Sequence, residues 1–349
     1  MKKSIRYTVY LIISVVLLLE IALRIYNPFR FRVKGDHIVL ETDKKYIIDN
    51  SNIPVLDRII VHTKNKLGFR GPDLPPDYNN RLSVICIGGS ATECAYLNDG
   101  KTWADILYDK LQHDFPGIWM NNAGVAGHSS YGHIALIKEH IIPLHPGYAL
   151  ILLGANDIRR TKTHSGKLSL FIAIARHSEL CNVILNIARA REAKTKNLTD
   201  TYIDLKKSDS LALTGTAIAD YLKNEDEWVS HYRKRLDTIL DLCISNHIKP
   251  VLITQPALPG TGRDPVTNVS LETLKVNSTE NGKLWWTMLE KYNEGTRKTA
   301  KARNILLIDL AHLLPKSSAY FYDLVHFTNS GAEKAGTILY DSLRVMLHN

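Results

Sequence analysis

Short apolar segments of strand length alternate with longer amphipathic segments of helix length from Arg81 onward. We expect strands at Leu82–Ile87, Ile118–Asn122, Ala149–Leu153, Pro250–Thr254 and Ile305–Asp309. We expect helices at Thr102–Phe115, Tyr131–Ile142, Trp228–Asn246, Leu284–Arg303 and about Asn329–Leu347. This alternation favours an α/β fold with a mainly parallel sheet that helices cover on both faces. Active sites in such sheets lie outside the carboxyl ends of the strands, so the residues there carry the functional prediction.

The first strand ends within Val84–Glu93, "VICIGGSATE", where an apolar run stops at two glycines and Ser90. One interpretation is a glycine-rich turn that closes the strand, with the serine capping the next helix. The other interpretation is chemical, because the same turn would present a serine nucleophile at the edge of the sheet. The residues at the other strand ends decide between the two.

Those other strand ends carry the residue types that a serine nucleophile needs. "AGVAGHSS" follows the second strand, "GAND" follows the third, and "YDLVHFTNSG" follows the fifth. His326 can take the Ser90 proton while Asp323 orients the imidazole. The oxyanion needs preorganised donors, which we expect from the Ser90 N–H, the Gly127 N–H and the Asn156 side-chain amide. Each motif alone is common in turns, caps and surface loops, but their order and placement indicate one catalytic centre.

With these motifs in this order, the chain resembles the SGNH hydrolases, the GDSL-like esterase and lipase family. The matching blocks are "IGGSATE", "NNAGVAGHSS", "GANDI" and "DLVHFT". The resemblance implies that Ser90 is the nucleophile, with Gly89 in place of the aspartate of the family name. We place the glycine of the second block at Gly127 rather than Gly124, from its distance to Asn122-Ala123.

The resemblance covers roughly residues 81–348, apart from an insertion at about 160–227. It implies a flavodoxin-like three-layer α/β/α sandwich, the SGNH hydrolase fold, with no metal or organic cofactor. The stretch "HTKNKLGFRGPDLP" and the N-terminal segment resemble the subset of the family that is fixed in bacterial envelopes, often near polysaccharide assembly.

The N-terminal segment is long and apolar enough to cross a bilayer. Residues 7–26 follow Lys2, Lys3 and Arg6 and form a run of about 20 residues, the length of a transmembrane helix. Glu20 and Arg24 are the only charges in the run, and four residues apart on a helix they can pair. No convincing cleavage motif follows, so we expect an uncleaved anchor rather than a buried helix or a signal peptide. Basic residues stand on both sides of the run, and from those ahead of it we expect the bulk of the chain to lie outside the cytoplasm.

We therefore expect a single-pass protein in several parts. They are a basic tail at 1–6, a transmembrane anchor at 7–26, an extension and linker at 27–80, and a catalytic domain at 81–349 with a helical insertion at about 160–227. The apolar, helix-periodic part of the insertion, "LSLFIAIARHSELCNVILNIARAREAK", either packs on the core, forms a lid, or faces the membrane near the anchor.

Composition narrows the range of partners and cofactors. The net charge of +9 is scattered, without an arginine-rich arm or a nucleic-acid motif, so we expect no nucleic-acid partner. The four cysteines show no CxxC pair, and a disulfide is possible but unsupported. Five histidines cluster in sequence without a ligand spacing such as HExxH, so we expect no metal. They are His128, His133, His140, His145 and His164.

The favoured function is an esterase that forms an acyl-enzyme on Ser90 and hydrolyses an O-acetyl ester on an envelope or exported polysaccharide. An O-acyltransferase would use the same residues, with a sugar hydroxyl in place of water. A lipid or lysophospholipid esterase is a further alternative if the apolar insertion lines a channel. A catalytically silent glycan-binding protein is the alternative from another class, and the intact set of site residues argues against it. Sequence leaves the oligomeric state open.

Overall fold

The computed structural model describes residues 2–29, 31, 33–35, 37–160, 166–195 and 201–347. The chain divides into two compact units. Unit 1 comprises residues 1–40 and 162–199, and unit 2 comprises residues 41–161 and 200–349. The expected insertion at about 160–227 falls partly in each unit, and its residues 161–165 and 196–200 lie outside the described residues.

Unit 2 is built on a five-stranded parallel sheet of order β6-β5-β7-β8-β9. Its strands are β5 Ser83–Gly88, β6 Trp119–Asn122, β7 Tyr148–Leu153, β8 Lys249–Thr254 and β9 Leu306–Ile308. Each overlaps an expected strand, and the prediction of a parallel α/β sheet is confirmed. Counted along the chain, the strand order is the flavodoxin-like order, which reverses direction between β5 and β7. The reversal leaves room for a site at the carboxyl ends of these two neighbouring strands.

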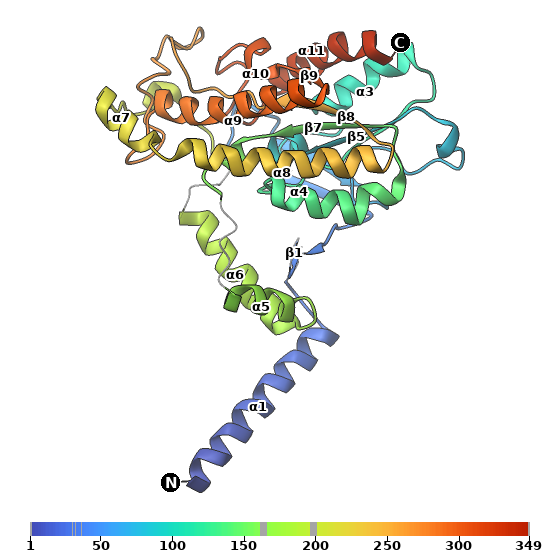
Figure 1. Ribbon diagram of the computed structural model, residues 1–349, viewed down its shortest axis with the longest axis vertical. Helices are drawn as coiled ribbons and strands as arrows, with labels where there is room; N and C mark the ends of the chain where they lie inside the picture. Colours follow the sequence, from blue (N-terminus) through green and yellow to red (C-terminus); the bar gives the residue numbers. More distant parts are fainter. Residues whose placement is uncertain are drawn as a thin grey trace. The chain divides into compact units, whose positions relative to one another are not determined.

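Helices cover both faces of this sheet (Figure 1). The helices of unit 2 are α2 Ser90–Glu93, α3 Trp103–Asp114, α4 Ser130–Leu136, α7 Gly215–Leu222, α8 Glu225–Ser245, α9 Gly282–Arg303, α10 Leu310–Leu313 and α11 Asn329–Leu347. Val84 and Cys86 point to one face, where they join the core cluster that α3 and α11 complete. Ile85 and Ile87 alternate with them and are equally buried, on the face toward α4, α8 and α9. Burial on both faces explains why the strands read as continuous apolar runs rather than as an alternation.

Several element boundaries differ from the sequence-based expectation. The helix expected at Tyr131–Ile142 is α4 followed by a π turn at Ile137–Ile141 and a 3₁₀ turn at Ile142–Leu144, where Pro143 cannot donate to an α-helical ladder. Helix α9 begins at Gly282 because the Asn281 side chain accepts the Leu284 N–H and caps it. An antiparallel pair, β3 Lys44–Asp49 and β4 Ile59–Lys64, precedes the sheet, and β3 was not predicted because half of its residues are charged.

Unit 1 contains the long N-terminal helix and a pair of shorter helices. Its elements are α1 Lys2–Ile25, the short antiparallel pair β1 Val33–Lys34 and β2 His37–Ile38, α5 Gly166–Ala175 and α6 Glu179–Thr195. The apolar stretch that looked like one helical segment is divided into α5 and α6. The division falls at Ser178, whose hydroxyl accepts the Cys181 N–H and starts a new helix. Ile172, Ala175 and Leu185 form a small core between the two helices.

Candidate active site

A sharp turn between β5 and α2 presents Ser90 at the carboxyl edge of the sheet. All six residues of β5 are buried, Gly89 caps α2, and Ser90 is the first residue of that helix. A Cβ atom on Gly89 would lie 2.4 Å from Nδ2 of Asn156, which follows β7. Only glycine lets the amide come this close. The turn is therefore built around a contact between the ends of two neighbouring strands.

Ser90, His326 and Asp323 form an unbroken line of hydrogen bonds. The Ser90 Oγ lies 2.6 Å from His326 Nε2, and His326 Nδ1 lies 2.6 Å from Asp323 Oδ2. With the imidazole proton on Nδ1, the ring donates to the carboxylate and its Nε2 accepts from the serine hydroxyl. Such an arrangement can remove the hydroxyl proton and stabilise the imidazolium that results.

The loop that carries Asp323 and His326 is closed by its own backbone. Phe321 and Phe327 pair across it as an isolated bridge, and the Tyr322 N–H donates to the His326 carbonyl at 3.0 Å. Asp323 Oδ1 accepts the N–H groups of Val325 and His326 at 2.9 and 2.8 Å. One oxygen of the carboxylate thus holds the loop while the other holds the imidazole.

Asn156 lies in a 3₁₀ turn, Ala155–Asp157, directly after β7. Its Nδ2 donates to the His128 carbonyl at 3.0 Å. The neighbouring Asp157 is buried and accepts hydrogen bonds from Ser130 and from Arg235, whose Nη2 lies 3.2 Å away. Burial raises the pKa of Asp157, while these donors act in the opposite direction. The buried contacts fix the turn and leave the Asn156 amide against Gly89, the residue before Ser90.

Gly127 lies in the loop between β6 and α4, with φ of +76°, a conformation that favours glycine. A Cβ atom there would meet nothing within 4 Å. The preceding N–H, that of Ala126, donates to Glu93 Oε2 at 2.8 Å. The structure thus brings Ser90, Asn156, Asp323 and His326 together directly, whereas Gly127 belongs to the adjacent loop and does not line the cavity described next.

A small cavity of about 20 Å³ opens beside Ser90. Its lining includes Ser90, His128, His133, Asn156, Gln255 and Val325. Burial lowers the pKa of His133 to about 3, so this imidazole is neutral. A cavity of roughly 10 to 15 Å³ is enough for one water molecule, so this one takes a group of about that size. His128, one of the five histidines close in sequence, lines this cavity.

A model of the GDSL-like lipase/acylhydrolase family matches residues 86–334, most of the chain. The chain belongs to this family. The match begins within β5 and ends within α11, so Ser90, Asn156 and His326 lie inside it. Membership makes the chain a carboxylic ester hydrolase. No curated protein sequence matches it.

Similar solved structures are remote in sequence. A lipase/acylhydrolase from Enterococcus faecalis is 15% identical, with 76% of this chain and 96% of that chain covered and a TM-score of 0.44. A catalytic mutant of an acetylxylan esterase from Geobacillus stearothermophilus is 17% identical, with coverages of 75% and 92% and a TM-score of 0.43. A GDSL-like lipase from Bacteroides thetaiotaomicron is 14% identical, with coverages of 79% and 92% and a TM-score of 0.42.

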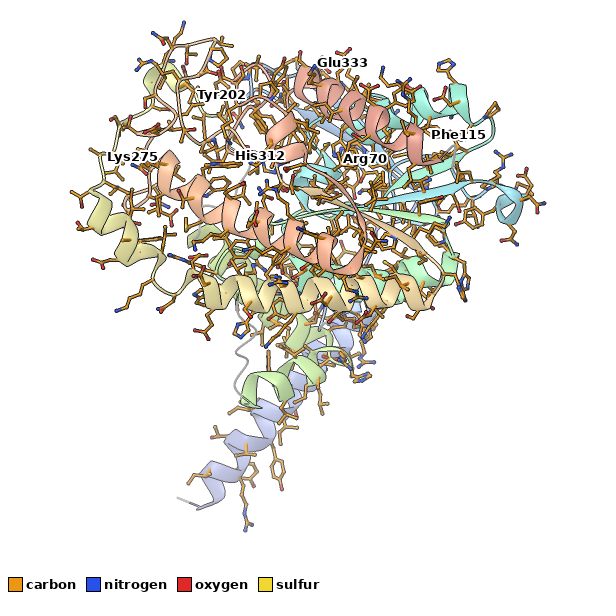
Figure 2. The ribbon with its side chains drawn as sticks, turned by 45° about the horizontal axis from the view of Figure 1, so that its top comes forward. Arg70, Phe115, Tyr202, Lys275, His312 and Glu333 are labelled. Atoms are coloured by element: carbon orange, nitrogen blue, oxygen red, sulfur yellow. The ribbon has the colours of Figure 1, made fainter. Side chains whose placement is uncertain are left out.

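Arg70 is a supporting residue of this GDSL-like site that the sequence analysis did not single out. Its side chain is 1% exposed and lies in the interior of unit 2 (Figure 2). The guanidinium donates to the carbonyls of Glu93, Cys94 and Leu97 at 2.6 to 3.0 Å, and to Asp99 at 2.9 Å. It therefore satisfies the carbonyls at the end of α2, the helix that begins with Ser90. In the sequence Arg70 stands within "GFRG". Nothing in that stretch indicates that its side chain binds the carbonyls at the end of α2.

Glu93 links α2, the helix that begins with Ser90, to the Gly127 loop. Its buried carboxylate pairs with Lys64 of β4 at 3.0 Å and accepts the Ala126 N–H. The β3–β4 pair thereby contributes a charge to the site from outside the main sheet. Sequence reasoning missed this residue because a glutamate in a helix is most often a solvated one.

The described residues contain no cluster of three or more histidine, cysteine, aspartate or glutamate side chains able to hold a metal ion. His164, one of the five histidines close in sequence, lies outside the described residues. All four cysteines are described and are free thiols, with Cys86, Cys94 and Cys243 buried.

Proposed function

We propose that the chain is a serine esterase that forms an acyl-enzyme on Ser90, with His326 as general base and Asp323 as the group that orients it. The unbroken hydrogen bonds from Ser90 through His326 to Asp323 carry the proposal. They lie at the carboxyl ends of the strands, where an open α/β sheet receives its ligand. Family membership supplies the reaction class, ester hydrolysis.

In the acylation half, the Ser90 Oγ attacks the ester carbonyl carbon while its proton moves to His326 Nε2. The carbonyl oxygen becomes an oxyanion, for which the Ser90 N–H, the Asn156 Nδ2–H and the Gly127 N–H are the proposed donors. The intermediate then breaks its bond to the alkoxy oxygen, which takes the proton from His326 and leaves as the alcohol. Asp323 stabilises the imidazolium between the two transfers.

In the deacylation half, a water molecule takes the place of the alcohol. His326 removes a proton from the water as its oxygen bonds to the acyl carbon. The second tetrahedral intermediate breaks its bond to Ser90 Oγ, which recovers its proton from His326, and the carboxylic acid leaves. An acyltransferase would differ only in using a sugar hydroxyl in this half.

The size of the cavity favours a small acyl group. About 20 Å³ beside Ser90 has room for the methyl group of an acetyl ester. We therefore propose an O-acetyl ester as the substrate.

We propose that α1 anchors the protein in a membrane, with unit 2 outside the cytoplasm. Ile5–Ile25 is a helix long and apolar enough to cross a bilayer. Lys2, Lys3 and Arg6 near its start favour a cytoplasmic N-terminus. An enzyme held outside the cytoplasm faces envelope and exported glycans, so an acetylated polysaccharide is the proposed substrate.

The test uses the full chain in detergent micelles, with Ser90→Ala as the matched control. Nitrophenyl esters from acetate to long acyl chains are compared, followed by acetate release from acetylated polysaccharide. We expect the acetate ester to be hydrolysed fastest. In Ser90→Ala we expect kcat to fall by about 10⁴- to 10⁶-fold.

Other outcomes separate the alternatives. A preference for long chains would contradict the acetyl proposal and favour a lipid esterase. Transfer of the acetyl group to an added sugar, at the expense of hydrolysis, would favour an acyltransferase. Equal turnover by Ser90→Ala would rule out Ser90 as the nucleophile, and a folded wild-type protein without turnover would favour a glycan-binding role.

A further inference from the structure

We propose that the α5–α6 pair, residues 166–195, lies in the interfacial layer of a membrane beside α1, with its exposed apolar side chains against lipid. The inference rests on the proposed membrane anchoring by α1, and it is independent of the chemistry at Ser90. It assigns a role to the part of the insertion that the esterase reaction does not use.

The end of α1 is joined to the start of α6 by partly buried polar contacts. The Glu20 carboxylate accepts the N–H groups of Glu179 and Leu180, each at 3.1 Å, and the Ser178 hydroxyl at 2.9 Å. These are donors that the first turn of a helix leaves without an internal partner. A carboxylate at a helix N-terminus is also favoured by the helix dipole. Glu20, the one acidic residue of the apolar run, thus caps the start of α6.

Arg24 extends this junction. Its Nε lies 2.8 Å from Glu20, as the four-residue spacing predicts, and its Nη2 donates to the His177 carbonyl between α5 and α6. The two charges of the apolar run are therefore both used to hold the α5–α6 pair at one end of α1. Figure 1 shows this end of α1 next to α5 and α6.

The chain that leaves α1 then runs along α6. Glu179 accepts from Asn27 at 2.9 Å and also pairs with Lys34. The Gly35 N–H donates to Asn182 at 3.1 Å, and Asn186 donates to the Val33 carbonyl at 2.9 Å. Cleavage after α1 would remove the acceptor at the start of α6, so this structure favours a retained helix over a signal peptide.

The α5–α6 pair keeps apolar side chains exposed after its own core is filled. Leu170 and Ile174 lie four residues apart on α5, and Leu170 is 64% exposed. Ile184 and Ile187 lie three residues apart on α6, and Ile184 is 51% exposed. Residues three or four apart share a helix face, so each helix exposes a pair of apolar side chains on one face. Single exposed apolar residues are ordinary, but two such pairs in a unit joined to a membrane-length helix give that unit apolar surface that lipid can cover.

The charge of the segment fits the same surface. Residues 166–195 contain five basic and two acidic residues. An excess of lysine and arginine in a segment attracts it to the anionic headgroups of a bilayer. Because α1 would hold the segment at the bilayer, these charges would stay close to the headgroups.

The experiment places one nitrobenzoxadiazole label at a time on the full chain in nanodiscs of zwitterionic and anionic phospholipid. Leu170→Cys and Ile184→Cys are the test positions, in a Cys181→Ser background so that the partly exposed native thiol does not react. Leu18→Cys in α1 is the membrane control, and Val266→Cys, 61% exposed in unit 2, is the water control. Quenching is measured with a nitroxide-labelled phospholipid and with aqueous iodide.

We expect the fluorescence of the labels at 170 and 184 to be blue-shifted and quenched by the nitroxide lipid, like that of the label at 18. The fluorescence of the label at 266 should be quenched by iodide alone. Labels at 170 and 184 that behave like 266 would overturn the proposal, and so would labels shielded from both quenchers, which would mean that protein covers the face. Loss of lipid quenching at 18 would instead reject the membrane anchor itself. Nitrophenyl acetate hydrolysis by each variant reports a folded unit 2, so failure of the esterase proposal is seen separately.

Discussion

Asp323 and His326 are held by their own loop, whereas Ser90 and Asn156 are held by residues from distant parts of the chain. On the side of the proposed base, which we call the base side, residues 321–327 form a loop closed by the Phe321–Phe327 bridge, and the Asp323 carboxylate accepts the N–H groups two and three residues ahead. On the side of the proposed nucleophile, which we call the nucleophile side, Arg70 and Lys64 secure α2, and Arg235 secures the turn of Asn156. Substitutions on the base side should therefore lower activity with little loss of stability. Substitutions that loosen α2 or the turn of Asn156 on the nucleophile side should lower activity and stability together.

The largest expected effect tests the base side. Asp323→Asn keeps an oxygen for the N–H groups of Val325 and His326 but no longer accepts the His326 Nδ1 proton as an anion. We expect kcat/KM for nitrophenyl acetate to fall by about 10⁴-fold. The melting temperature should change little, because the loop keeps its backbone bonds. A large loss of stability with the same loss of activity would contradict the idea of a self-held loop.

The next effect tests the proposed oxyanion donor on the nucleophile side. Asn156→Ala removes the side-chain amide, and we expect kcat to fall by about 10²- to 10³-fold with a smaller change in KM. Gln255→Ala is the matched control, because Gln255 lines the same cavity but donates to the Pro256 carbonyl. Equal losses from both variants would mean that Asn156 acts through the shape of the cavity rather than through its N–H group.

Arg70→Met tests the coupling of stability to activity. The apolar side chain leaves the carbonyls of Glu93, Cys94 and Leu97 without their donor, and we expect the free energy of unfolding to fall by about 2 to 4 kcal/mol. Chemical denaturation measures this change, and the activity of the remaining folded protein should fall as α2 loosens.

Arg58→Met is the control for that variant. The Arg58–Asp49 pair is well exposed, so its loss should change the free energy of unfolding by less than about 1 kcal/mol. If Arg70→Met were as mild as Arg58→Met, the proposed dependence of α2 on Arg70 would be wrong.

The last prediction concerns the pH dependence of stability. Burial lowers the pKa of His133 from 6.5 to about 3. Between these values the unfolded chain binds a proton that the folded chain does not, so the free energy of unfolding rises as the pH rises across this window. His133→Leu should reduce that slope, as measured by urea unfolding at several pH values. An unchanged slope would show that His133 does not contribute to it.

Much of the fold could be read from local patterns. Each of the five core strands was expected within a residue or two, because burial on both faces leaves continuous apolar runs. Ser90, His326 and Asp323, which the structure joins by hydrogen bonds, were also expected to meet, because strand ends lie at one edge of a parallel sheet. The boundary of α4 and the division between α5 and α6 were missed, since they depend on a π turn and on the cap formed by Ser178.

The sequence by itself determined the α/β sheet, the order of the polar motifs at the strand ends, and a three-residue spacing that lets Asp323 orient His326. These features follow from periodicity and from short-range backbone geometry. Only the tertiary structure decided that Arg70 secures the helix of Ser90, that Glu93 links it to the Gly127 loop, and that Glu20 caps α6. Each of these contacts joins residues far apart in the chain, and a charged side chain carries no local signal of the backbone group it will bind.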